Sequence, residues 1–175
     1  IKFTNELTDS ENFIIVDNKK YKYNDRGFDY VEFYISTNAG EDVKPLIKVA
    51  SGGEISRIML ALKSVLAKSD KLPILIFDEI DTGVSGRIAQ KVGKALKSLA
   101  SYHQIIAITH LPQIAGLSDY HFVVEKKKSG DRVVSSIRLL NEEEKIREVA
   151  RLISGEKITE AALTGAKELI SQKNN

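Results

Sequence analysis

Two adjacent carboxylates, Asp78 and Glu79, are the residues of this sequence best placed to do chemistry. They directly follow residues 74–77, an uninterrupted apolar run that begins just after Pro73. Such a run is typical of a strand buried on both faces of a parallel sheet, and proline is tolerated at the start of a strand. We therefore expect the two acids at the carboxyl end of a central strand, where open α/β sheets bind ligands.

An acid pair in that position is compatible with two roles. In a magnesium–nucleotide site of the P-loop type, Asp78 would face the metal and Glu79 would face an attacking water molecule. In the alternative, the two acids lie at the edge of a sheet and cap the next helix. The turn at 81–86, which contains glycine and serine, separates them from that helix.

A second chemical feature is Ser51-Gly52-Gly53-Glu54, which stands directly before an amphipathic helical pattern. A helix that begins at Ser-Gly-Gly presents unpaired backbone N–H groups and the positive end of its dipole, with no bulky side chain in the way. That arrangement is typical of an anion site. The alternative is a plain helix cap, in which Ser51 accepts a hydrogen bond from the first turn and the glycines are merely flexible.

A third feature is His110, which follows a second apolar run at 104–109. A histidine at the end of a strand either makes a structural hydrogen bond or contacts a ligand bound beside the sheet. Its place after the second apolar strand, in the same relation to that strand as Asp78 and Glu79 have to the first, favours the ligand-facing role.

The elements that must position these groups are predicted from hydrophobic periodicity and turn residues. They are strands at 13–16 and 28–37 with a turn at 24–27, a loop at 38–49, helices after 51–54 and at 85–99, a hairpin of 121–125 with 133–140, and two helices opened by Asn141 and Thr159. This order indicates an α/β fold, with a mostly parallel sheet flanked by helices and an antiparallel hairpin, in one domain without an internal linker. The run at 126–128, three lysines, is expected at the hairpin tip as a solvated end or, alternatively, as a contact for a phosphate backbone.

Composition bounds the possible classes of protein. The 175 residues contain 42% apolar and 29% charged residues, as expected of a soluble globular protein. The net charge of +2 neither favours nor excludes nucleic acid. No apolar run approaches the roughly 20 residues that a membrane helix needs. The absence of cysteine excludes disulfides and thiolate metal sites and favours an intracellular location.

Because the chain starts at Ile1 and its only methionine is Met59, we expect it to be a piece of a longer protein.

The three chemical features occur in an order that resembles the carboxyl-terminal part of an ABC-type ATPase head, a P-loop NTPase fold. In that family Ser51-Gly52-Gly53-Glu54 would be the signature motif and residues 74–79 the Walker B strand. Asp81 and its neighbours would form the D-loop, and His110 would be the switch histidine. Four sequence segments further resemble the SMC-related ATPases of bacterial DNA repair. They are KVASGGEISR, FDEIDTGVSGR, ITHLPQIA and REVARLISGEKIT.

The resemblance implies a role for each of these residues. ATP and Mg²⁺ are the expected cofactors, and in such heads the ATP lies between two protomers. Residues 51–54 and Asp81 would bind the cofactor at that interface, with the signature of one protomer closing on the γ-phosphate held by the other. Asp78 would hold Mg²⁺ through water, and Glu79 would be the general base. His110 would contact the γ-phosphate and the attacking water.

The sequence also departs from the complete family pattern. No G-x-x-x-x-G-K-[ST] phosphate loop, Q-loop or coiled-coil arm is present. Residues 1–175 are therefore predicted to be the carboxyl-terminal lobe of an ABC/SMC-type head that is an ATPase only in the full-length dimer and inactive alone. The expected partners are the missing Walker A lobe and coiled coil, a second copy and DNA. A role in double-strand break repair and recombination in the cytoplasm, at the nucleoid and without a membrane, follows. The alternatives are a fragment of an ABC transporter nucleotide-binding subunit and a non-catalytic module on the same fold.

Overall fold

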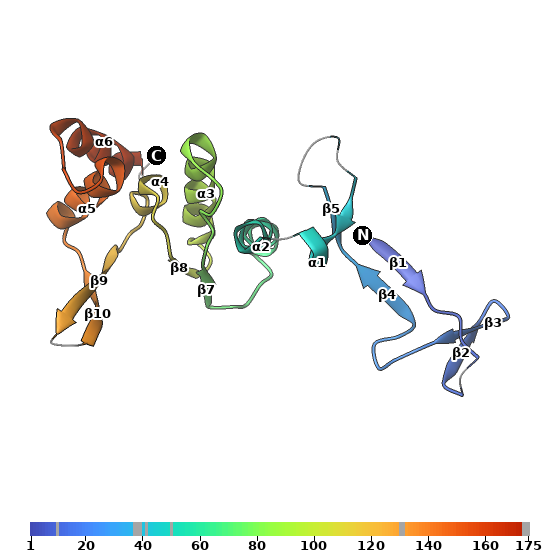
Figure 1. The fold of residues 1–175 in the computed structure, drawn as a ribbon. Helices are drawn as coiled ribbons and strands as arrows, with labels where there is room; N and C mark the ends of the chain where they lie inside the picture. Colours follow the sequence, from blue (N-terminus) through green and yellow to red (C-terminus); the bar gives the residue numbers. More distant parts are fainter. Residues whose placement is uncertain (10, 37–39, 41, 50, 130–131, 173–175) are drawn as a thin grey trace. The chain divides into compact units, whose positions relative to one another are not determined.

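The computed structural model describes residues 1–9, 11–36, 40, 42–49, 51–129 and 132–172. The chain divides into two compact units, Ile1–Ser51 and Gly52–Asn175. The sequence had indicated one domain without an internal boundary, whereas the structure places a boundary directly within the Ser-Gly-Gly turn. Figure 1 shows the elements of both units in chain order.

The first unit consists of short antiparallel strand pairs and one short helix. Its elements are β1 (Lys2–Asn5), β2 (Phe13–Val16), β3 (Lys19–Lys22), β4 (Asp29–Glu32), β5 (Tyr34–Ile35), β6 (Lys44–Pro45) and α1 (Leu46–Val49). Strand β1 pairs with β4, β2 with β3, and β5 with β6. Asp17 and Asn18 join β2 to β3 with φ of 48° and 61°, as a two-residue hairpin turn requires.

Two predictions for this unit are wrong. The single strand expected over 28–37 is divided at Phe33, because β4 pairs with β1 whereas β5 pairs with β6. The Phe33 carbonyl accepts a hydrogen bond from the backbone N–H of Leu46 at 2.7 Å, outside either ladder. The expected loop at 38–49 contains β6 and α1, and residues 37–39 and 41 lie outside the described residues.

The second unit alternates helices with strands. Its elements are α2 (Gly52–Leu66), β7 (Ile74–Phe77), α3 (Gly86–Leu99), β8 (Gln104–Ala107), α4 (Pro112–Ala115), β9 (Phe122–Ser129), β10 (Arg132–Leu139), α5 (Glu142–Ser154) and α6 (Glu160–Ser171). Strands β7 and β8 are parallel, with Phe77 opposite Ala107, so their carboxyl ends lie at the same edge. Of the five strand pairs in the described residues, this pair alone is parallel, and the predicted hairpin of β9 with β10 is antiparallel.

Two apolar clusters form the core of the second unit. The first lies between β7, α2, α3, α4 and the loops beside them. It consists of Leu60, Ala67, Leu75, Phe77, Ile80, Val92, Leu96, Leu99 and Ile114. The second joins α4, α5 and α6, and consists of Ala115, Val149, Ala150, Ala162 and Ala166. Helices α5 and α6 lie side by side in Figure 1.

Strand β7 is covered on one face only. Leu75 and Phe77 are 9% and 5% exposed, whereas Ile74 and Ile76 are 48% and 67% exposed. The prediction that this strand is buried on both faces is therefore wrong for this chain. Successive side chains of a strand point to opposite faces, so the helices that cover Leu75 and Phe77 cannot cover their neighbours.

The helix boundaries follow their capping residues. Asn141 Oδ1 accepts a hydrogen bond from the Glu144 N–H and Glu144 Oε2 accepts one from the Asn141 N–H, both at 2.9 Å, which forms a capping box at the helix start predicted for Asn141. Gly155, with φ of 80°, ends α5, and the Thr159 hydroxyl caps α6. In the described part of the chain, no helix has the length and apolar character needed to cross a membrane.

Candidate functional site

The acid pair directly follows β7, at the carboxyl end of the strand as predicted, but β7 belongs to a two-stranded sheet and is not the central strand that was expected. Asp78 and Glu79 are both exposed, and Asp78 Oδ1 accepts a hydrogen bond from the Glu79 N–H at 2.8 Å. Glu79 has φ of 55°, which is uncommon for a residue other than glycine and costs on the order of 1 kcal/mol. The chain therefore turns sharply at Glu79 immediately after the strand ends.

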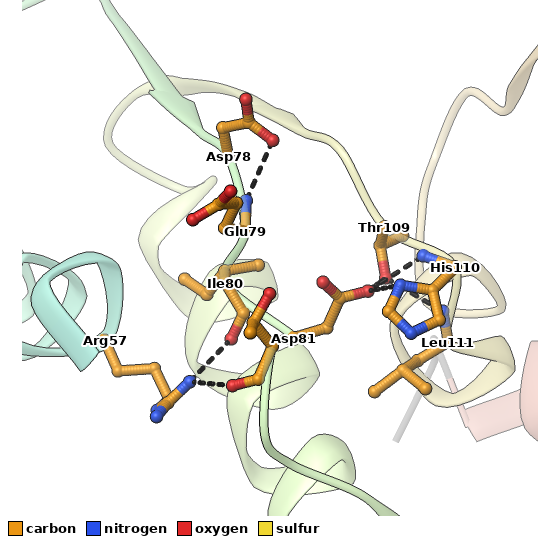
Figure 2. Close-up of polar contacts among 9 residues, drawn as sticks. Arg57, Asp78, Glu79, Ile80, Asp81, Thr109, His110 and Leu111 are labelled. Atoms are coloured by element: carbon orange, nitrogen blue, oxygen red, sulfur yellow. Dashed lines mark hydrogen bonds and ion pairs between the residues drawn. The ribbon is translucent and has the colours of Figure 1, made fainter. Parts of the chain in front are cut away.

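The second turn of α2 holds this loop through hydrogen bonds to the backbone carbonyls of the loop. The Ser56 hydroxyl donates to the Asp78 carbonyl at 2.7 Å. The Arg57 guanidinium donates to the Thr82 carbonyl at 2.7 Å and to the Ile80 carbonyl at 3.4 Å (Figure 2). Neither Ser56 nor Arg57 was singled out from the sequence. The signal that could have identified them is a pair of side-chain donors near the start of a helix, in a chain with an acid-rich loop.

The two glycines are needed because the start of α2 lies very close to the same loop. Gly53 is buried, and a Cβ added to it would lie 2.9 Å from both the Glu79 carbonyl and the Thr82 side chain. Gly52 is exposed, and a Cβ there would overlap the Glu79 carboxylate. Glu79 therefore rests against the glycine turn of its own chain. Glu54 is half-buried in the first turn of α2, and Ser51 belongs to the other unit.

Asp81 and His110 are brought into direct contact. Asp81 is 4% exposed, and its Oδ2 accepts hydrogen bonds from the Thr109 hydroxyl at 2.6 Å and the His110 backbone N–H at 2.8 Å. The His110 Nδ1 lies 3.0 Å from the same oxygen, while 73% of the His110 side chain is exposed. Thr109 also accepts a hydrogen bond from the Leu111 N–H at 3.1 Å.

These contacts decide the charge of Asp81. Burial by itself raises the pKa of a carboxyl group, but the hydrogen bonds from Thr109 and the His110 backbone, together with the nearby imidazole, outweigh it and leave the pKa of Asp81 below its ordinary value. Asp81 is therefore an ionised, buried carboxylate at neutral pH. In Figure 2 it points toward Thr109 and His110, away from the Asp78 and Glu79 carboxylates.

The donor set is suited to a magnesium ion that arrives with phosphates. Within the described ranges, no three His, Asp or Glu side chains gather closely enough to hold a metal ion by themselves. Mg²⁺ needs only one or two protein carboxylates when phosphates and water complete its shell. Asp78, exposed beyond the end of β7, fits that limited role.

No family model matches the chain, but it is similar to curated proteins over most of its length. It is 50% identical over 151 residues to the DNA repair protein RecN of Halalkalibacterium halodurans, covering 86% of this chain and 27% of that protein. It is 41% identical over 158 residues to RecN of Bacillus subtilis, with 90% and 27% covered. The chain is a relative of the RecN proteins.

The similarity to RecN confirms the family resemblance that the motifs had indicated. RecN of Vibrio cholerae is 44% identical over 144 residues, covering 82% of this chain. The chain spans about a quarter of the length of these RecN relatives. Among solved structures, a chain from work on ATP-driven dimerization and DNA-stimulated activation of SMC ATPases is 24% identical with a TM-score of 0.46, covering 68% of this chain and 71% of its own.

Proposed function

We propose that residues 1–175 form the carboxyl-terminal lobe of a RecN-like ATPase head that acts in the repair and recombination of broken DNA. The observation that carries this proposal is the parallel pairing of β7 with β8. It brings Asp78 and Glu79 to the same sheet edge as His110, in a chain 50% identical to a DNA repair protein. Ligands of open α/β sheets bind at that edge.

The exposure of these residues supports a proposed role for each. Asp78 holds a magnesium ion, which neutralises phosphate charge when ATP is bound. Glu79, whose carboxylate is exposed beside Asp78, orients or deprotonates the attacking water. His110 presents an exposed imidazole to the γ-phosphate. The N–H groups of the turn that begins α2, from Ser51 to Glu54, bind phosphate supplied by a second protomer.

The uncovered face of the parallel pair supports the presence of a further lobe. Ile76 of β7 and Ile106 of β8 are opposite each other in the register and are 67% and 44% exposed. An apolar sheet face of this kind is stable only when another layer covers it. The RecN relatives have about three quarters of their length outside the matched region, and we propose that a Walker A lobe from that part covers this face.

The proposal also names the partners and the cellular location of the complete protein. The chain itself has no phosphate-cradling lysine loop, so ATP is bound by the joined lobes and by a homodimer of heads. DNA is the substrate on which the complete protein acts, in the cytoplasm and in association with the nucleoid. The RecN relatives favour this function over a transporter subunit.

The test is ATP hydrolysis by the full-length protein with Glu79→Gln. We expect a loss of kcat of about 100-fold or more, with ATP retained at the site, since a general base typically contributes that much. Glu143→Gln, an equivalent change at an exposed residue of α5, is the control and should leave kcat unchanged. Hydrolysis at the normal rate by Glu79→Gln would contradict the proposal, and so would full-rate hydrolysis by residues 1–175 alone.

A further inference from the structure

We propose that Asp81 is a positioning residue that fixes the ring orientation and the protonated nitrogen of His110 within its own chain. This inference rests on the function proposed above, in which His110 faces the nucleotide. Family resemblance had assigned Asp81 to the interface between protomers. Within the single chain, the Asp81 side chain is 4% exposed and accepts hydrogen bonds from two donors of the turn that carries His110.

The geometry leaves the Asp81 carboxylate little freedom. Its Oδ2 receives the Thr109 hydroxyl, the His110 backbone N–H and the His110 ring at 2.6, 2.8 and 3.0 Å. The Thr109 hydroxyl oxygen in turn accepts a hydrogen bond from the Leu111 N–H. These contacts join the loop after β7 to the turn after β8, so the ring of His110 is fixed by the element that also carries Asp78 and Glu79.

The chemistry of the contact identifies which ring nitrogen carries hydrogen. An ionised carboxylate only accepts hydrogen bonds, and Nδ1 lies 3.0 Å from Oδ2, so the contact favours hydrogen on Nδ1. The Nε2 atom is then the one left for a ligand. In the neutral ring it accepts a hydrogen bond from water, and in the protonated ring it donates to phosphate. Without the carboxylate, the ring is free to rotate and to move its hydrogen to Nε2.

The first test is a double-mutant cycle in the full-length protein. Asp81→Asn should lower kcat by about tenfold or more while the KM for ATP stays within about twofold, because orientation of the imidazole is lost and ground-state binding is kept. In a His110→Ala background, Asp81→Asn should have no further effect. A further loss of kcat in that background would overturn the inference, because Asp81 would then act by another route.

A matched control separates positioning from a loss of stability. Asp70→Asn removes a carboxylate that is 13% exposed and paired with Lys63 in the same unit, away from His110. We expect it to lower the melting temperature but to leave kcat unchanged. If Asp70→Asn lowers kcat as much as Asp81→Asn does, the effect at Asp81 is a general loss of stability and the inference fails.

The second test does not depend on activity. In the full-length protein with ¹⁵N-labelled histidine, proton–nitrogen NMR correlations should show hydrogen on Nδ1 of His110 at neutral pH. A ring with hydrogen on Nε2 alone would overturn the inference even if a variant failed to fold. Should Glu79→Gln hydrolyse ATP normally, the proposed function itself fails. If Glu79→Gln is inactive and Asp81→Asn keeps the normal kcat, only the role of Asp81 fails.

Discussion

The two units of the chain differ in how much apolar surface they bury. Every fully buried apolar side chain of the described residues belongs to the second unit, from Leu60 to Ala166. The first unit, taken over its described residues, has strands rich in aromatics but no buried residue, and Phe3 and Phe33 are 64% and 57% exposed. A two-stranded sheet cannot bury the apolar side chains of one face unless another layer packs against that face. Apolar composition alone therefore does not make a core.

This difference in buried apolar surface explains why the candidate site residues lie almost entirely in the second unit. Ile80, which stands between Glu79 and Asp81, is completely buried in the first apolar cluster of the second unit. Anchoring that one residue fixes the turn, with Glu79 exposed on one side and the Asp81 carboxylate directed to Thr109 on the other. Of the predicted site residues only Ser51 lies in the unit without a core. A rigid core under a loop is what allows its side chains to be placed for chemistry.

The largest expected effect comes from truncating the same residue type in each unit. Leu99→Ala, at a side chain 2% exposed, should lower the free energy of unfolding by about 2–5 kcal/mol. Leu7→Ala, at a side chain 62% exposed, should change it by less than about 0.5 kcal/mol. Denaturant unfolding of the 175-residue chain, followed by its helix circular dichroism, measures both.

That signal reports on the second unit, because all described helices longer than one turn belong to it. Equal losses for the two variants would mean that Leu7 contributes to the stability of the second unit as Leu99 does. The contrast between the units would then be wrong.

A smaller effect is expected from removing one side-chain cap in each unit. Asn141→Ala breaks the capping box of α5 and should lower the free energy of unfolding by about 1 kcal/mol. Asn24→Ala removes an acceptor that receives the Arg26 N–H at 2.8 Å in a turn of the first unit. We expect it to leave the unfolding midpoint of the helices unchanged. A shift as large as that of Asn141→Ala would show that the two units unfold as one.

Local signals predicted much of the second unit. The helix starts at Asn141 and Thr159 and the apolar run at 74–77 each determine an element through neighbours in sequence, and each is observed. The division at Phe33 and the bare face at Ile76 were not predicted, because both depend on which distant segment pairs with or covers the strand. Periodicity carries no information about a missing layer.

In the candidate site, too, local sequence signals predict the elements but not the contacts between distant segments. Two apolar strands each followed by polar residues were enough to predict that Asp78 and His110 lie at one edge, because parallel strands bring their ends together. The contact of Asp81 with His110 joins residues 29 positions apart through side-chain orientation. The hydrogen bond from the Arg57 guanidinium to the Thr82 carbonyl likewise joins residues that are far apart in the sequence. No spacing rule predicts such contacts.

The smallest effect is a dependence of stability on pH that belongs to the second unit, since all three histidines of the sequence are in it. Burial lowers the pKa of His121 below its ordinary value of 6.5, Glu148 opposes this and Lys145 adds to it. As the pH falls through 6.5, the unfolded chain binds a proton that the folded protein does not yet accept, so the free energy of unfolding must decrease. In His121→Gln the decrease between pH 7.5 and 6 should be smaller, measured by denaturant unfolding of the same helices. If His121→Gln keeps the full decrease, the proton is taken up elsewhere and burial of this ring is not its cause.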